Sequence, residues 1–159
     1  MLHFDERGNL KPYDCIRSSI DEMKDYFVNA IESETREKNF EKYMRYSSDL
    51  KRHSGGRELK QWINGSFVTM KNNPNDIDLV TFLDQEQIRN LGKFIENFKM
   101  HNGLLLYGVD AYIVEEYPLS SNRFSYTAGN KAYWNMQFVN TKMNRLGRKY
   151  RKGFLEIIY

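Results

Sequence analysis

Two aspartates in the middle of the chain have the spacing and the neighbours of a metal site. Asp76 and Asp78 lie two residues apart in a segment, 76–83, that is otherwise apolar and predicts a strand. Side chains two apart on a strand point to one face, so the two carboxylates are expected to lie together while Ile77 and Leu79 enter the core. Paired carboxylates repel one another unless a cation or a proton lies between them. Mg²⁺ would supply that cation, because hard cations bind carboxylate and phosphate oxygens.

A third aspartate, Asp110, lies in a later apolar segment, 104–114, which also predicts a strand. A helix is predicted between the two segments, and a strand–helix–strand connection normally returns the chain beside its starting strand. Asp110 is therefore expected across from the first pair. Three carboxylates at the ends of adjacent strands can hold two divalent cations, which clamp the attacking and leaving oxygens of a phosphoryl displacement. Alternatively, Asp110 is a buried acid paired with an Arg or Lys.

The Gly65-Ser66 turn precedes the carboxylate strand and follows another short predicted strand, 59–63. Residues 67–70 could begin a short helix, which would place the Gly65 and Ser66 N–H groups at a helix N-terminus, where anions are favoured. These N–H groups and the Ser66 hydroxyl are expected to hold phosphates. Positioning and charge neutralisation are most of what phosphoryl transfer needs from a protein.

The elements that would position these residues follow from hydrophobic spacing and from capping residues. We expect an extended arm over 1–15, a helix from Ile16 to Ile31 near a Ser19 cap, and a helix through 40–50 that stops at Gly55-Gly56. A further helix begins after Asp84, which forms a capping pair with Gln87, and ends at 102–103. Residues 120–130 are expected to form a loop, 132–139 a short helix and 154–158 a strand. The order predicts one α/β domain, 1–159: a small mixed sheet with helices on one side, divided into a helical arm, 1–56, and a sheet core, 57–159.

Length and composition set limits on the class of protein. A chain of 159 residues with a net charge of +3 is expected to form one domain and is compatible with anionic ligands. Cys15 is the only cysteine, so no internal disulfide can form and a cytoplasmic location is expected. The histidines show no zinc-site spacing, and no apolar stretch approaches a membrane span, so no membrane partner is expected.

The residues resemble the DNA polymerase beta-like nucleotidyltransferase superfamily. Its signature is a Gly-Gly or Gly-Ser pair, a spacer, and then Asp-apolar-Asp/Glu-apolar, which Gly65-Ser66 and the segment 76–79 match. The third carboxylate of the superfamily lies on a later strand, as 109–112 does. The whole chain is similar to small stand-alone bacterial nucleotidyltransferase-like proteins, which share the segment 62–69 and a late Lys152-Gly153. Asn64 departs from the pattern, because the superfamily commonly has an apolar residue there.

The resemblance implies a polymerase beta-like fold and a role for each matching residue. Asp76 and Asp78 would bind both Mg²⁺ ions, and Asp110 would bind the catalytic ion and orient or deprotonate the acceptor hydroxyl. Gly65 and Ser66 would bind the β and γ phosphates of an NTP co-substrate. The nucleotidyl group would pass to a hydroxyl on RNA or protein. Some relatives are described as toxins of toxin–antitoxin or defence modules, which implies a cognate antitoxin protein as a partner.

Two other functions remain open at this point. The chain could be a non-catalytic nucleotide- or partner-binding module on the same fold. It could also bind RNA through the basic stretch 142–152. Otherwise this stretch is a solvated surface, or it binds a nucleotide triphosphate with Lys152 as a phosphate contact. The aromatic residues Tyr133, Trp134 and Phe138 are either core residues or a platform for stacked bases.

Overall fold

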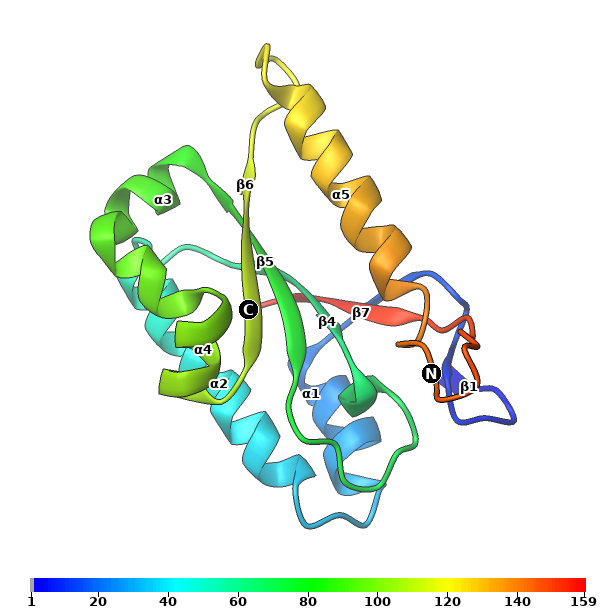
Figure 1. The fold of residues 1–159 in the computed structure, drawn as a ribbon. Coiled ribbons are helices and arrows are strands. Elements are labelled where there is room, and N and C mark those ends of the chain that lie inside the picture. Colours follow the sequence, from blue (N-terminus) through cyan, green and yellow to red (C-terminus); the bar gives the residue numbers. More distant parts are fainter. Residues whose placement is uncertain (1) are drawn as a thin grey trace.

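A five-stranded mixed sheet forms the centre of the computed structural model, which describes residues 2–159 (Figure 1). Its strands, in spatial order, are β3 (Cys15–Ser18), β7 (Phe154–Ile158), β4 (Lys60–Asn64), β5 (Asp78–Asp84) and β6 (Asp110–Glu116). The outer pairs β3–β7 and β5–β6 are parallel, whereas β4 is antiparallel to both of its neighbours. A small antiparallel sheet pairs β1 (His3–Phe4) with β2 (Leu10–Lys11).

Helices make up most of the remaining regular structure. The α-helices are α1 (Ile20–Lys24), α2 (Arg36–His53), α3 (Gln85–Leu91), α4 (Met100–Tyr107) and α5 (Phe124–Phe138). A π-helical turn (Asp25–Asn29) extends α1, and 3₁₀ helices occupy Ser66–Val68 and Gly92–Phe98. The coarse prediction of a mixed α/β fold is therefore confirmed. Within residues 2–159, no helix is long and apolar enough to cross a membrane.

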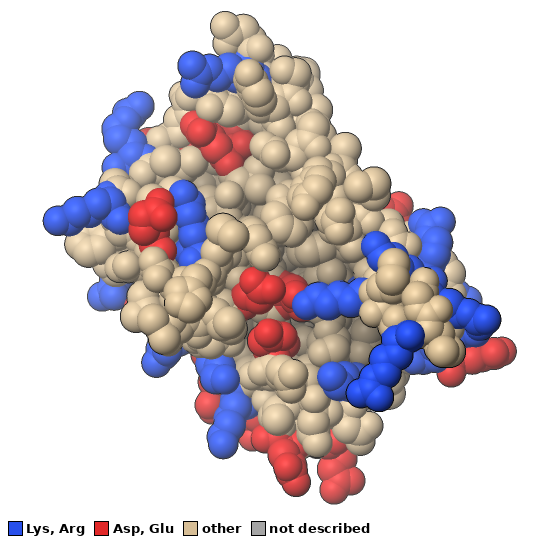
Figure 2. Space-filling view, viewed as in Figure 1, with Lys and Arg blue, Asp and Glu red and all other residues tan. Residues whose placement is uncertain are grey.

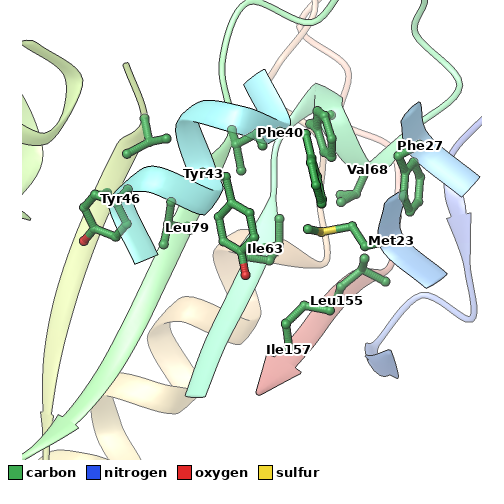
Figure 3. Packing of buried hydrophobic residues seen from close by; sticks show 14 of the residues in the cluster. Met23, Phe27, Phe40, Tyr43, Tyr46, Ile63, Val68, Leu79, Leu155 and Ile157 are labelled. Carbon is green, nitrogen blue, oxygen red and sulfur yellow. The ribbon is translucent and has the colours of Figure 1, made fainter. Parts of the chain in front are cut away.

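Both faces of the sheet are covered, because successive strand residues point to opposite sides. Ile63 and Leu79 belong to the larger core cluster with Tyr43 of α2, whose packing Figure 3 shows. Their neighbours Trp62 and Val80 belong to a second cluster, which contains Phe138 of α5. Figure 1 shows α2 and α4 on one side of the strands and α5 on the other. The prediction that the helices lie on one side is therefore wrong for α5.

The first fifteen residues are more structured than an extended arm. Leu2 and Leu10 are buried, and the Phe4 ring meets Phe27 edge-on at 5.8 Å between centroids. The first helix begins only after Ser19, whose side chain accepts a hydrogen bond from Glu22 N as the capping pattern predicted. The expected helical start at Ile16 is wrong, because that residue lies in β3 and pairs with the last strand.

The segment expected to form a strand over 104–114 divides into a helix and a strand. Residues 100–107 form α4, and Gly108 ends it in the left-handed conformation (φ 74°). The Tyr107 ring lies 5.5 Å from the ring of Tyr46 on α2, so packing against α2 favours the helix. A short apolar run fits a helix or a strand equally well, which explains the error. The preceding helix is also interrupted, since α3 ends at Leu91 and a 3₁₀ helix follows.

Two further expectations are corrected. The polar stretch 120–130 is not a loop, because α5 begins at Phe124 and includes the short helix expected at 132–139. This helix contacts the sheet along one narrow face and buries only Thr127 and Phe138, so most of its residues can be polar. The second correction concerns Asp76, which precedes β5 rather than lying on it. By contrast, the ends of α2, β4 and β7 and the Asp84–Gln87 capping box agree with prediction to within a few residues.

Arg36 at the start of α2 is the largest of the fully buried side chains. Its guanidinium donates hydrogen bonds to the backbone carbonyls of Phe27, Phe67, Thr69 and Lys71. Burial lowers its pKa to about 10, well above neutral pH, so the charge is retained and is stabilised by carbonyl dipoles. This contact ties the turn after α1 to the segment that follows β4.

Arg36→Met is expected to lower the free energy of unfolding by about 3 kcal/mol or more, because it leaves several buried carbonyls without a donor. Urea denaturation monitored by circular dichroism measures the change. Arg17→Met is the control, since Arg17 is 92% exposed and its ion pair with Glu156 is worth little. Equal losses in the two variants would show that the Arg36 contacts contribute no special stability.

Candidate functional site

The three aspartates meet where β5 and β6 begin. These strands are parallel, and Asp78 stands opposite Asp110 in the register, so the predicted position of Asp110 is confirmed. The Asp110 N–H donates to the carbonyl of Ile77 at 3.0 Å, which ties the start of β6 to the segment between the other two aspartates. Asp76 approaches from the loop that leads into β5.

The Gly65-Ser66 turn lies directly beside Asp78. Strand β4 is antiparallel to β5, and Asn64 is the register partner of Asp78, so the chain turns next to that carboxylate. Gly65 adopts a φ of 81°, and a Cβ atom there would lie 1.9 Å from Asp78 Oδ2. Only glycine allows both this backbone conformation and this approach. The short helix predicted after the turn is a 3₁₀ helix that begins at Ser66.

A single cavity of about 1390 Å³ brings all five predicted site residues together: Gly65, Ser66, Asp76, Asp78 and Asp110. Residues from α5 and from the loop after it form the opposite wall. Figure 2 shows acidic side chains in the centre of this face and basic side chains beside them. The cavity therefore has an acidic wall from the sheet and a basic wall from the C-terminal part of the chain.

Two of the carboxyl groups, Asp76 and Asp110, hold their protons more tightly than usual. Burial raises the pKa of Asp76 and Asp110, and repulsion by Asp78 raises both further. Lys142 partly offsets this repulsion, since its Nζ lies 3.5 Å from Asp78 Oδ1. The attraction of Asp78 in turn raises the pKa of Lys142. The Lys142 side chain is 88% exposed, so it can leave this position at little cost in packing.

A second lysine, Lys152, supports the glycine turn from inside the protein. Its Nζ donates to the carbonyl of Gly65 at 2.8 Å, and only 3% of the residue is exposed. Burial lowers its pKa to about 8, while the attraction of Asp78 partly opposes this shift. Lys152 therefore brings positive charge close to Gly65 without occupying the open space of the cavity.

Asn64 contributes a buried acceptor to the same cavity. Asn64 lines the cavity and is only 7% exposed. Its Oδ1 atom has no hydrogen-bond partner within residues 2–159. Buried polar atoms are nearly always paired, because an unpaired acceptor costs about 1–3 kcal/mol. Such an atom beside Asp78 is typical of a site that a ligand or solvent completes.

Hard divalent cations fit the chemistry of this donor set, although the side chains are not arranged around one. Among the described residues, no group of three or more His, Cys, Asp or Glu side chains is placed to hold a metal ion. Instead, the Lys142 ammonium provides positive charge beside Asp78. The partly buried carboxylates repel one another, which favours a cation between them. A bound ion would require Asp76, Asp78 and Asp110 to turn toward it and Lys142 to withdraw.

Several cavity residues were not predicted as site residues. Tyr112 lies on the same face of β6 as Asp110, and its ring centroid is 4.6 Å from that of Trp134 on α5. Two-residue spacing from Asp110 could have indicated Tyr112. Asn64 could have been indicated as a site residue because it is polar where the nucleotidyltransferase pattern commonly has an apolar residue. Nothing in the sequence distinguishes Lys142 from the other cations of the basic stretch, because its contact depends on the path of the loop.

Gly65→Ala is expected to lower the free energy of unfolding by more than Gly56→Ala does. Both glycines have a positive φ, so the backbone strain of about 1–2 kcal/mol is shared. Nothing lies within 4 Å of the Cβ position at Gly56, whereas at Gly65 the Asp78 carboxylate must move. Urea denaturation compares the two variants, and equal losses would contradict the close approach of Asp78 to the turn.

Asp110→Asn is expected to stabilise the metal-free protein at pH 7. A raised pKa means that the folded state holds its proton more tightly than the unfolded state, so this carboxyl group destabilises the fold increasingly as pH rises through its folded pKa. The gain should shrink toward pH 4, as measured by thermal unfolding in EDTA. Asp84→Asn is the control, because hydrogen bonds from Gln87 and Arg57 outweigh burial there and lower the pKa. A gain for Asp84→Asn equal to that for Asp110→Asn would contradict this account.

Comparison with known proteins identifies a family without assigning an activity. A search of curated proteins found no match, and a search of solved structures also found none. One family of sequences, described as a family of unknown function (DUF6932), matches residues 2–158. Because this match covers nearly the whole chain, the protein belongs to the DUF6932 family.

Proposed function

We propose that this protein is a metal-dependent nucleotidyltransferase with a polymerase beta-like fold, which moves a nucleotidyl group from an NTP to a hydroxyl of RNA or protein. The register that sets Asp78 beside Asp110, with Asp76 and Gly65-Ser66 in the same cavity, is the observation that carries the proposal. It unites in one space the predicted ligands of the metal ions and the predicted phosphate-binding turn.

In the proposed reaction, the acceptor hydroxyl oxygen forms a bond to the α-phosphorus of the NTP. The bond between that phosphorus and the oxygen bridging to the β-phosphate breaks, and pyrophosphate leaves. The hydroxyl proton passes to the Asp110 carboxylate, which acts as the general base. Two Mg²⁺ ions, held by Asp76, Asp78 and Asp110, would supply charge stabilisation for the attacking and leaving oxygens.

Other groups in the cavity support phosphate binding. The Gly65-Ser66 turn offers backbone N–H groups and the Ser66 hydroxyl, and no side chain at Gly65 blocks the approach. Because the Lys142 side chain is 88% exposed, it can leave Asp78 when a metal ion replaces it, and its charge can then move to the triphosphate. Charge on the two sides of the cavity thus matches a cation–triphosphate complex, which needs anionic ligands for the metal and cationic ligands for the phosphates.

The Lys142–Asp78 ion pair also favours a second candidate, a non-catalytic binding module on the same fold. A lysine that permanently neutralises the carboxylates would remove the need for metal ions and would leave the cavity for a nucleotide or a protein partner. The two candidates differ in whether Mn²⁺, used as a probe for Mg²⁺, binds to the wild-type protein together with a non-hydrolysable NTP.

Wild-type protein is expected to transfer label from one of the four α-³²P NTPs to an acceptor in total RNA or in a cell lysate, in the presence of Mg²⁺. Asp78→Asn and Asp110→Asn are each expected to reduce the transfer rate by at least about a hundredfold, because each removes a metal ligand. Asp84→Asn, at the far end of β5 and outside the cavity, is the control and should retain the rate.

Equal labelling by wild type and by the Asp78 and Asp110 variants would overturn the catalytic assignment. Tight binding of a nucleotide without Mn²⁺, and without transfer to any acceptor, would favour the binding module. Circular dichroism of each variant shows that a lost rate does not result from a lost fold.

A further inference from the structure

Charge is divided unevenly along the chain. Residues 117–155 contain eight of the 24 Lys and Arg residues and none of the 21 Asp and Glu residues. This segment therefore carries +8, while the rest of the chain carries −5 of the net +3. Such an asymmetry is typical of chains that bind nucleic acid or another polyanion, and the modest net charge conceals it.

The fold places this basic segment on one wall of the cavity. It forms α5 and the loop 140–151, and Tyr133, Met136, Lys142 and Lys149 all line the space that faces the aspartates. Basic side chains gather beside the central acidic group in Figure 2. A polyanion on this wall would run directly toward the carboxylates.

Three cations of this loop are not neutralised by acidic side chains of the described residues. Arg145, Arg148 and Lys149 are exposed, and none forms an ion pair with an acidic side chain of residues 2–159. Elsewhere the pattern differs: Glu116, for example, pairs with both Lys60 and Lys131.

Backbone hydrogen bonds from Thr141 N to Tyr150 O (2.8 Å) and from Asn144 N to Arg148 O (2.9 Å) give this loop the form of a hairpin. The three cations Arg145, Arg148 and Lys149 are thus presented on an ordered loop. Phosphate contacts on an ordered loop cost less conformational entropy than contacts on a disordered chain.

An exposed aromatic side chain lines the same cavity as Lys149 and the aspartates. Tyr133 is 52% exposed and lines the cavity, and its ring centroid lies 5.4 Å from that of Trp134. Trp134 in turn packs on Tyr112 and Phe138, which fixes the position of the pair. A fixed, half-exposed ring beside free cations is the combination that binds single-stranded nucleic acid, with bases stacked and phosphates neutralised.

We propose that loop 140–151 and Tyr133 bind a single-stranded nucleic acid and lead its terminal hydroxyl to Asp110. As a statement about the acceptor, this rests on the proposed function and narrows it from RNA or protein to a nucleic-acid strand. As a statement about binding, it stands on the charge distribution and on the exposed ring alone. A folded protein acceptor offers neither a regular row of phosphates nor unpaired bases.

Fluorescence anisotropy with short labelled single strands of RNA and of DNA, without NTP, tests the proposal. The triple variant Arg145→Glu, Arg148→Glu, Lys149→Glu is expected to lose at least tenfold in affinity and to reduce the salt slope, log Kobs against log salt, by about 2. The control variant Lys38→Glu, Arg89→Glu, Lys93→Glu changes net charge equally at exposed positions outside loop 140–151 and should bind almost as wild type does.

Tyr133→Ala distinguishes a nucleic-acid site from a general polyanion site. It is expected to weaken strand binding about tenfold through lost stacking and to leave the affinity for inorganic polyphosphate unchanged. Equal effects of the two triple variants, or no effect of Tyr133→Ala on strand binding, would overturn the proposal. Transfer of label to a protein, with no strand binding, would overturn this inference and leave the proposed function standing. Strand binding without transfer to any acceptor would overturn the proposed function and leave the proposed strand-binding site standing.

Discussion

Repulsion among three carboxylates at the adjoining ends of β5 and β6 is the constraint on which the rest of the site depends. Backbone pairing holds Asp78 opposite Asp110, so the backbones that carry these side chains cannot separate without breaking the sheet. Positive charge is brought to them from outside the sheet, by Lys142 at the surface and by Lys152 beneath Gly65. The C-terminal part of the chain thus balances the charge of the central strands, and the proposed binding of a cation–triphosphate complex rests on this division of charge across the cavity.

The backbone around these carboxylates is positioned by interactions that have no part in chemistry. Arg36 holds the segment after the glycine turn by donating hydrogen bonds to the carbonyl oxygens of Phe67 and Thr69. Gly65 has no side chain, so Asp78 can lie against the main chain there. Both depend on features that a substitution of similar size cannot replace, a planar five-donor group and a missing Cβ. The site is therefore sensitive to changes at Arg36, which does not line the cavity, as well as at Gly65, which does.

The pairing of Asp78 with Asp110 was predictable because a strand–helix–strand crossover returns the chain beside its starting strand, whatever the length of the intervening helices. The cap at Asp84 was predictable because it depends on residues three apart. The helix over 100–107 was not, since Leu104 to Tyr107 carry no periodicity and contact with α2 decides their conformation. The contact of Lys142 with Asp78 and the burial of Arg36 were also beyond reach, because both depend on loops whose paths are set by distant parts of the fold.

The pairing of β3 with β7 joins residues near the two ends of the chain, and β7 lies between β3 and β4 in the sheet. During synthesis, β3, β4, β5 and β6 all emerge before the strand that joins β3 to the others. The basic loop next to the carboxylates is likewise held at its end by β7, through hydrogen bonds from Gly153 and Phe154 to the N-terminal segment. Contacts of such long sequence separation form late in folding. The nascent chain would therefore carry its carboxylates without the complete cavity until β7 has left the ribosome and joined the sheet.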